Sequence, residues 1–254
     1  MKKQKITPAS LTSPAANSHL KGLQQYFTPE PWAAALGAAL PQHRRTLLDP
    51  FAGNGSLCRG LANDTTRDVL GLDLDPTATL GGAKAWENHP AANARREMVH
   101  GDLLDLLPLL EETGTRFDLV ALNPPFSLVW PLPLLPAPLR TGITCCSLDS
   151  THATLRLAPT LLTPLGEAVL IANQSTLERI HASHPQDFSH VWLWLDLPSF
   201  FPGVDPAMRV AVLYLTGNPI GPVTRISPVG PVTPADLAGT LDSARHHHFR
   251  SNCI

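Results

Sequence analysis

Four consecutive residues, Asn123, Pro124, Pro125 and Phe126, combine a side-chain amide, stiff backbone carbonyls and an aromatic ring. They directly follow an apolar, strand-like run at 117–122. This set of groups is suited to holding a planar, amine-bearing group and to turning its nitrogen toward an electrophile. The alternative is structural, because an Asn-Pro pair also commonly begins a loop.

A second candidate segment lies at 49–56, directly after a short predicted strand at 46–48. Its glycines, Gly53 and Gly55, allow the backbone to approach a ligand closely and to enter a helix through a tight turn. The segment lacks the GxGxxG pattern of dinucleotide-binding turns and the lysine of phosphate-binding loops. It therefore favours a ligand without phosphate groups, and the alternative is a plain strand-to-helix turn.

Two carboxylates follow the next predicted strands. Asp73 ends the strand at 69–73, where it can accept hydrogen bonds from both hydroxyls of a ribose or act as a solvated turn residue. Asp102 follows the strand at 98–100 and can accept from the exocyclic amine of a bound adenine. It can also cap the helix that begins at Leu103, and the two roles are compatible because the carboxylate has two oxygens.

A fourth segment, Tyr26-Phe27-Thr28-Pro29, precedes the first strand. We predict that Thr28 caps a helix with Pro29 at its first position, and that this helix continues to about residue 40. Free N–H groups at such a helix start suit a small carboxylate. The alternative is a helix cap whose aromatic neighbours only pack.

Strand-like and helix-like segments alternate along the chain, and this pattern predicts a doubly wound α/β fold with a mostly parallel, seven-stranded sheet. The loop between the last two predicted strands is too short for a crossover helix, so the last strand should be antiparallel to its neighbour. Ligands of such sheets bind beyond the carboxyl ends of the strands, where most of the candidate residues fall. The predicted strands are 46–48, 69–73, 98–100, 117–122, 168–172, 191–197 and 209–215. The predicted helices that follow the first strand are 56–63, 75–88, 103–112, 152–162 and 175–183. The last of these helices begins with a capping box of Ser175 and Glu178.

The composition fits one large α/β domain, with 254 residues, 43% hydrophobic and 16% charged. The net charge of −2 does not favour tight nonspecific DNA binding, so a local patch or a partner would have to supply the contacts to phosphates. The basic N-terminus is not followed by the apolar core of a signal peptide, and no apolar run approaches the ~18 residues of a membrane span. We therefore expect a cytoplasmic protein that does not bind membranes.

No metal site is predicted. The four cysteines fit neither a disulfide framework nor a zinc site, and we interpret them as reduced thiols. The histidines at 181, 184 and 190 lack a credible ligand set, and the run at 246–248 is expected to lie in a solvated tail. The cysteines are Cys58, Cys145, Cys146 and Cys253.

We divide the chain into a flexible N-terminal arm at 1–20, a catalytic domain at 21–217 and a Pro/Gly-rich and polar tail at 218–254 with little independent structure. The proline-rich segment 130–138 can be neither helix nor central strand. It is either a semi-rigid wall or lid over the target group or a disordered surface loop. Trp192 and Trp194 are expected to pack on the same side of their strand.

Over residues 21–217, these motifs and their order resemble the class I S-adenosylmethionine-dependent methyltransferases, and more narrowly the N6-adenine DNA methyltransferases with an Asn-Pro-Pro-Phe motif. The resemblance implies that Asn123, Pro124, Pro125 and Phe126 are catalytic. It also implies that Phe126 and Phe200, the latter in an aromatic loop at 200–203, contact the target base. The implied cofactor-binding residues are Tyr26, Phe27, Thr28, Pro29, Asp49, Phe51, Gly53, Gly55, Asp73, Asp102, Leu103 and Asn123.

The chemistry of the residues agrees with this resemblance. If the Asn123 side-chain oxygen and the Pro124 carbonyl accept the two N–H bonds of an adenine amine, the nitrogen becomes more tetrahedral and its lone pair can face the sulfonium methyl group. Positioning of this kind can lower the activation free energy of a reaction by roughly 7–11 kcal/mol. The base must be flipped out of a duplex or lie in a single strand. Methylation of cytosine C5 is disfavoured, because the chain lacks a Pro-Cys pair.

Too few residues follow Gly217 for a target-recognition domain. We therefore expect that a separate specificity or defence-system subunit supplies recognition, that specificity is low, or that the chain is a catalytic piece of a larger system. A restriction–modification or defence setting is an analogy with the family. RNA and protein-glutamine methyltransferases use similar motifs and are the alternative enzymes, although the segment at 25–29 is more typical of the DNA enzymes. A non-catalytic, methyltransferase-like subunit is the remaining alternative.

Overall fold

The computed structural model describes residues 27–79, 95–126, 128–197, 209–228, 230 and 232–251. The predictions for Tyr26, for Phe200 and its loop at 200–203, and for the N-terminal arm at 1–20 fall outside these ranges. Within them, we find no helix whose length and apolar character would let it cross a membrane.

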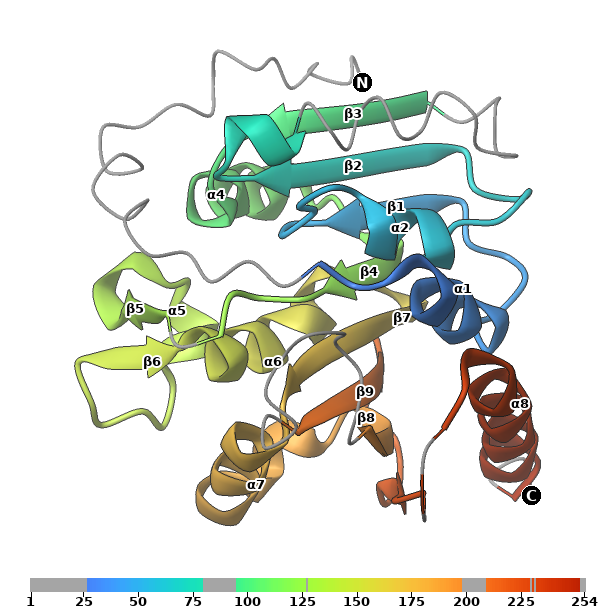
Figure 1. Ribbon diagram of the computed structural model, residues 1–254. Helices are drawn as coiled ribbons and strands as arrows, with labels where there is room; N and C mark the ends of the chain where they lie inside the picture. The colour runs from blue at the N-terminus through green and yellow to red at the C-terminus, as the bar shows by residue number, and fades with distance from the viewer. Residues whose placement is uncertain are drawn as a thin grey trace.

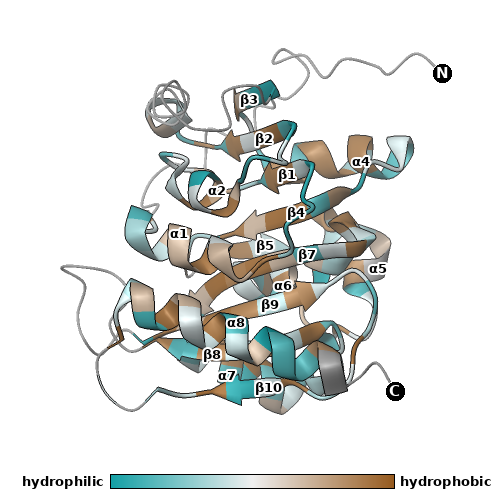
Figure 2. Cartoon of the chain, turned by 90° about the vertical axis from the view of Figure 1, so that its right-hand side faces the viewer, coloured by the Kyte–Doolittle hydropathy of each residue, from teal (hydrophilic) through white to brown (hydrophobic). Residues whose placement is uncertain are grey.

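The main sheet has eight strands in the order β10-β8-β9-β7-β4-β1-β2-β3. Figure 1 shows the sheet from β8 to β3, and Figure 2 also labels β10. All neighbouring strands are parallel except β9, which is antiparallel to both β7 and β8. The predicted mostly parallel sheet and the antiparallel strand at 209–215 are therefore confirmed, but the sheet has eight strands and not seven, because β10 follows that strand. The strands are β1 Thr46–Asp49, β2 Asp68–Asp73, β3 Arg95–His100, β4 Phe117–Leu122, β7 Leu162–Asn173, β8 Val191–Leu197, β9 Val210–Thr216 and β10 Thr224–Ile226.

Helices cover both faces of this sheet, and each face contributes to a separate hydrophobic cluster. One cluster includes side chains from α1 Glu30–Ala38, α2 Ser56–Leu61 and α8 Pro234–Ser251. The other includes side chains from α4 Leu103–Thr113, α6 Ser150–Leu161 and α7 Gln174–Ser183. The central strands are apolar along their length (Figure 2), as expected when both faces of a parallel sheet are buried.

Two predicted helix caps are wrong by one or two positions. Pro29, not Thr28, is the N-cap of α1, and no side chain caps that helix. Asn173, not Ser175, caps α7, because its Oδ1 accepts from the N–H groups of Ser175 and Thr176.

Trp192 and Trp194 lie in opposite hydrophobic clusters, so the expectation that they share a face is wrong. The pairing of β8 with β9 is irregular between Val191 and Leu193, which interrupts the strict alternation of side chains. The Trp192 ring lies against Tyr214 and Phe249, whereas the Trp194 ring stacks on Phe188.

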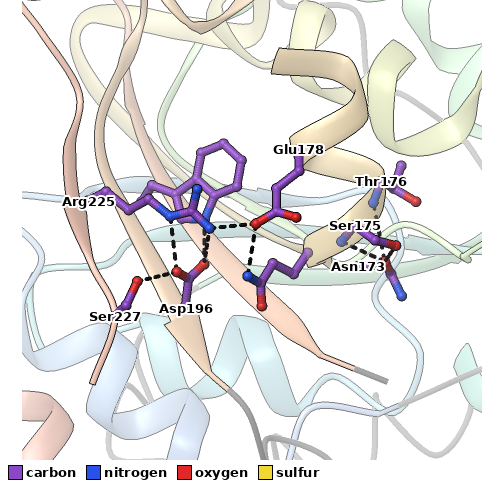
Figure 3. A network of polar contacts seen from close by, with 9 residues as sticks. Asn173, Ser175, Thr176, Glu178, Asp196, Arg225 and Ser227 are labelled. Carbon is purple, nitrogen blue, oxygen red and sulfur yellow. Dashed lines mark hydrogen bonds and ion pairs between the residues drawn. The ribbon is translucent and has the colours of Figure 1, made fainter. Parts of the chain in front are cut away.

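The segment at 218–254 is not a tail with little independent structure, because it contains β10 and α8. Arg225 of β10 pairs with Asp196 (Nε to Oδ2, 3.0 Å) and with Glu178 (Nη2 to Oε1, 2.7 Å), as Figure 3 shows. Its guanidinium also lies over the Trp194 ring, 4.5 Å from the centroid. These partners come from distant parts of the chain, so the local composition gave no sign of the strand.

Helix α8 is held by a buried ion pair. Arg245 makes two hydrogen bonds to Glu167 of β7, at 2.9 and 2.5 Å. Leu237 and Leu241 are fully buried, and the ring of His248 lies 5.5 Å from that of Trp192. The histidine run at 246–248 therefore belongs to a packed helix, in which His248 is buried and His246 and His247 are exposed.

The proline-rich segment forms a small separate structure beyond the carboxyl end of β4 (Figure 1). Strand β5 Val129–Pro131 pairs antiparallel with β6 Ser147–Asp149. Between them lie a 3₁₀ turn, η3 Leu132–Leu134, and one helical turn, α5 Ala137–Arg140. Trp130, Leu135 and Leu139 are buried in the main core. The segment is thus a packed wall and not the disordered surface loop of the other predicted alternative. We call residues 128–149 the ribbon.

Candidate active site

A cavity of about 360 Å³ opens beyond the carboxyl ends of β1, β2, β3 and β4. It brings together most of the described residues that the sequence singled out. Pro29, Asp49 and Gly55 are not on its wall. The predicted residues that line it are Phe27, Thr28, Phe51, Gly53, Asp73, Asp102, Leu103, Asn123, Pro124, Pro125 and Phe126.

The glycine turn after β1 depends on both of its glycines. Gly53 and Gly55 have φ values of 51° and 76°, which side chains with a Cβ rarely adopt. A Cβ on Gly53 would lie 2.6 Å from the Phe27 ring. The Gly53 N–H donates to Asp73 Oδ2 at 2.7 Å, so this residue joins three of the predicted segments.

Asp73 is buried, which excludes the solvated turn residue that the sequence left open. Its two oxygens accept from the backbone N–H groups of Gly53 and Asp75, at 2.7 and 2.8 Å. Burial raises the pKa of this carboxyl, and the two backbone hydrogen bonds oppose that shift. The carboxylate is fixed on the cavity wall at the end of β2.

Asp49 has a different environment, although it belongs to the same turn. Its side chain is fully buried behind the cavity wall, where Oδ1 accepts from the Phe51 N–H and Oδ2 has no hydrogen-bond partner. Burial raises the pKa of Asp49 to about 7, and the nearby charge of Asp73 adds to the shift. Burial also raises the pKa of the neighbouring Cys58 thiol.

Asp102 is the N-cap of α4, where its Oδ1 accepts from the Leu104 N–H at 2.9 Å. Sequence reasoning missed Asp105, which also lines the cavity and has a buried Oδ2 without a hydrogen-bond partner. The spacing was an available signal, because Asp102 is the N-cap of α4 and Asp105 lies in its first turn. Among the described residues that line the cavity, the charged side chains are those of Asp73, Asp102 and Asp105, and none is basic.

The Asn-Pro-Pro-Phe segment follows β4 and is tied down at two points. Asn123 Nδ2 lies 3.5 Å from the hydroxyl of the buried Thr28, which directs the amide nitrogen toward α1. Ser150, at the start of α6, donates its hydroxyl to the Pro125 carbonyl at 2.7 Å. Phe126 forms part of the cavity wall. The segment is therefore a braced turn and not a free loop.

The start of α1 provides fewer free N–H groups than we predicted. Trp32 and Ala33 both donate to the Pro29 carbonyl, and Pro31 has no N–H group. Glu30 also places a negative charge in this first turn. The segment is thus a poorer site for a small carboxylate than its sequence indicated.

The ribbon contributes a part of the wall that sequence reasoning did not identify residue by residue. The available signal was that the proline-rich segment directly follows the Asn-Pro-Pro-Phe segment. The Trp130 ring lies 6.2 Å from the Phe51 ring, so the ribbon meets the glycine turn across the cavity. The ribbon residues on the wall are Leu128, Val129, Trp130, Pro131 and Leu134.

Comparison with known proteins supports the fold and leaves the acceptor open. No family model matches the chain. A stretch of 106 residues, 39% of this chain, is 31% identical to an uncharacterized RNA methyltransferase of Geobacter sulfurreducens, and the match covers 18% of that protein. The chain therefore spans only a small part of this curated relative.

Two solved structures share the fold over most of the chain. A Listeria monocytogenes protein assigned to the class I S-adenosylmethionine-dependent methyltransferases has a TM-score of 0.65 and 16% identity, over 91% of this chain and 75% of that chain. The M protein of the type I restriction enzyme EcoKI has a TM-score of 0.59 and 17% identity, over 89% of this chain and 55% of that chain. The chain thus has the class I methyltransferase fold.

Proposed function

We propose that the chain transfers a methyl group from S-adenosylmethionine to the N6 amine of adenine in DNA. The observation that carries the proposal is that Asn123 and Phe126 line the same cavity as Asp73 and Asp102. An amine-holding segment and a set of acidic groups thereby share one space at the carboxyl ends of the strands, where such folds bind ligands. When bound, the cofactor supplies an electrophilic methyl group on a positively charged sulfur.

The cavity wall fits such a cofactor. Its acidic side chains and the lack of a basic one among the described lining residues favour a cationic ligand without phosphates. In this proposal Asp73 accepts from the ribose hydroxyls and Asp102 from the adenine amine. The buried Oδ2 of Asp105, which has no partner, is a further acceptor beside Asp102.

The braced turn after β4 supports the proposed role of Asn123. Because its Nδ2 is directed to Thr28, its Oδ1 is the atom of the amide that we assign to the target amine. The Pro125 carbonyl already accepts from Ser150, which supports the Pro124 carbonyl as the second acceptor. Phe126 then packs against the target base. These groups orient the amine, and none of them has to act as a strong base.

The choice of DNA rests on the segment Phe27-Thr28-Pro29, which resembles the DNA enzymes, and on the likeness to the EcoKI M protein. That likeness also supports a separate subunit that supplies specificity, since the chain itself has a net charge of −2. RNA is the second candidate acceptor, because the curated relative with 31% identity is named an RNA methyltransferase.

The proposal is tested by incubating the chain with cofactor carrying a labelled methyl group and, separately, with DNA, RNA and glutamine-containing protein from the same cells. We expect label in DNA, and N6-methyladenine after digestion and mass analysis. Label in RNA alone would establish the second candidate. Cofactor binding without label in any acceptor, with cell extract added to provide partners, would show a non-catalytic subunit.

A further inference from the structure

Three of the four large hydrophobic side chains that are exposed among the described residues line the cavity. Among the described residues, the large hydrophobic side chains that are exposed are Phe27 (43%), Val129 (56%), Leu134 (56%) and Leu165 (91%). All of them except Leu165 line the cavity. We call Phe27, Val129 and Leu134 the apolar lip. Exposed apolar side chains gathered around one opening mark a binding surface.

The lip is held in place by the folded structure around it. Val129 belongs to β5, whose register with β6 is fixed through the pair Trp130 and Leu148. The ribbon is further fixed by a hydrogen bond from the Ser150 N–H to the Leu128 carbonyl at 2.8 Å and by the buried side chain of Leu135. Val129 and Leu134 are therefore exposed because the packed ribbon holds both side chains at the opening of the cavity.

Charge restricts what can lie against the lip. The cavity behind it contains Asp73, Asp102 and Asp105, and no basic side chain is present among the described lining residues. A phosphate group would be repelled there and would find no counter-charge. From Leu128 to Leu134, the described wall residues of the ribbon have one polar side-chain group, the indole N–H of Trp130. The surface thus fits a flat, uncharged ring better than a charged or strongly hydrogen-bonding group.

We propose that the apolar lip binds the faces of unpaired nucleobases that flank the target base, while the phosphates stay outside the cavity. The inference rests on the proposed function and specifies it, because it requires a single-stranded or locally opened nucleic acid. Base faces are apolar in every sequence, so this surface adds affinity for unpaired strands without selecting a sequence.

The test measures binding and does not require turnover. The ligand is a fluorescein-labelled single-stranded DNA with one adenine between thymines, and its comparison ligand has abasic positions in place of the flanking thymines. Affinities are measured by anisotropy with S-adenosylhomocysteine present. We expect the wild-type chain to bind the thymine-flanked strand about tenfold more tightly than the abasic one.

The double variant Val129→Ser and Leu134→Ser should lose this tenfold preference. Because both side chains are more than half exposed, the substitutions should leave the fold intact. Leu165→Ser is the matched control, since Leu165 is exposed and is not on the cavity wall, and it should keep the preference. A lip variant that still prefers the thymine-flanked strand, or a wild-type chain without the preference, would overturn the inference.

Two other occupants of the lip are separate outcomes. If the wild-type chain is a dimer that the double variant converts to a monomer with unchanged DNA binding, the lip is an interface between copies and the inference is wrong. If only a glutamine-containing peptide competes for the lip, the inference is also wrong. If the strand binds in a way that depends on the lip but no methyl group is transferred, the proposed function is wrong and the inference about the lip stands.

Discussion

Asp49 and Asp73 both belong to the predicted site, but only the side chain of Asp73 faces the cavity. Asp73 lies on the cavity wall with both oxygens fixed by backbone N–H groups. Asp49 begins the glycine turn, but its carboxyl points into the core and keeps one oxygen without a partner. A buried carboxyl of this kind is costly when ionised, so it is held more easily in its neutral form.

The variant Asp49→Asn tests this difference. The pKa of Asp49 is raised to about 7, whereas the unfolded chain ionises this carboxyl near 4. The folded state therefore binds more protons between these values, and the free energy of unfolding that the group contributes falls as pH rises from about 4 to 7. Asparagine cannot ionise and can still accept from the Phe51 N–H. We expect the variant to unfold at a higher temperature than wild type at pH 8.

The same comparison at pH 4 is the control for this prediction. There the wild-type carboxyl is protonated in the folded state and resembles the amide, so the two proteins should unfold at nearly equal temperatures. A difference in unfolding temperature that does not change between pH 4 and pH 8 would contradict the assignment of Asp49 as a buried, titrating group.

For single residues, the sequence located the segments of the site better than it predicted which side chains face the cavity. Asn123, Asp73 and Asp102 were identifiable because each follows a strand that periodicity locates well. Whether a neighbouring side chain faces the cavity depends on packing, which explains why Asp49 and Pro29 are not on its wall. Tyr26 and Phe200 lie outside the described residues, so their roles stay predictions.

The element that most affects the site is the ribbon, together with the start of α6. Ser150 is fully buried and makes two bonds across this junction, from its N–H to the Leu128 carbonyl and from its hydroxyl to the Pro125 carbonyl. The turn that carries Asn123 and the wall that carries the apolar lip are thus connected through one residue. We infer that Ser150 is a positioning residue for the catalytic turn.

Substituting Ser150→Ala should lower kcat about tenfold and leave the Kd for S-adenosylmethionine unchanged, because small displacements of a positioning group are costly to rate. Ser183→Ala is the control for the loss of a serine hydroxyl away from the cavity, since the exposed Ser183 donates to the Arg179 carbonyl in α7 at 2.9 Å. The hydrogen bond that Ser150→Ala loses contributes about 1 kcal/mol of stability. Equal kcat values for both variants would assign Ser150 a purely structural role.

Elements with local signals were predicted, and those held by distant partners were not. The alternation of apolar runs and turn residues located the seven strands from β1 to β9 that belong to the main sheet. Strand β10 depends on Asp196 and Glu178, and α8 depends on Glu167, which are far away in the sequence. The proline content of 130–138 correctly excluded a central strand, but the exclusion of any helix is wrong, because the short helix α5 begins at Ala137, and the small ribbon was not predicted.

On the scale of the whole molecule, the cofactor side and the acceptor side of the proposed reaction share one cavity. The glycine turn, the acidic side chains and the braced turn after β4 follow neighbouring strand ends, and the ribbon forms part of the remaining wall. Every lysine of the chain lies within residues 1–26 and 80–94, outside the described ranges. Arginines are spread over the described residues, but none of them lines the cavity, so contacts to phosphates are expected away from the cavity wall or from a partner subunit.

The account depends most on Asn123 as the group that holds the target amine. The direct test compares wild type with Asn123→Ala for S-adenosylmethionine binding by calorimetry and for methyl transfer to single-stranded DNA. Asn173→Ala is the control, because it removes an asparagine at the end of the neighbouring strand β7 that caps α7 and is not on the cavity wall. We predict that Asn123→Ala reduces transfer at least about a hundredfold with unchanged cofactor affinity, and that Asn173→Ala does not. Transfer by Asn123→Ala at a near-native rate would contradict the account.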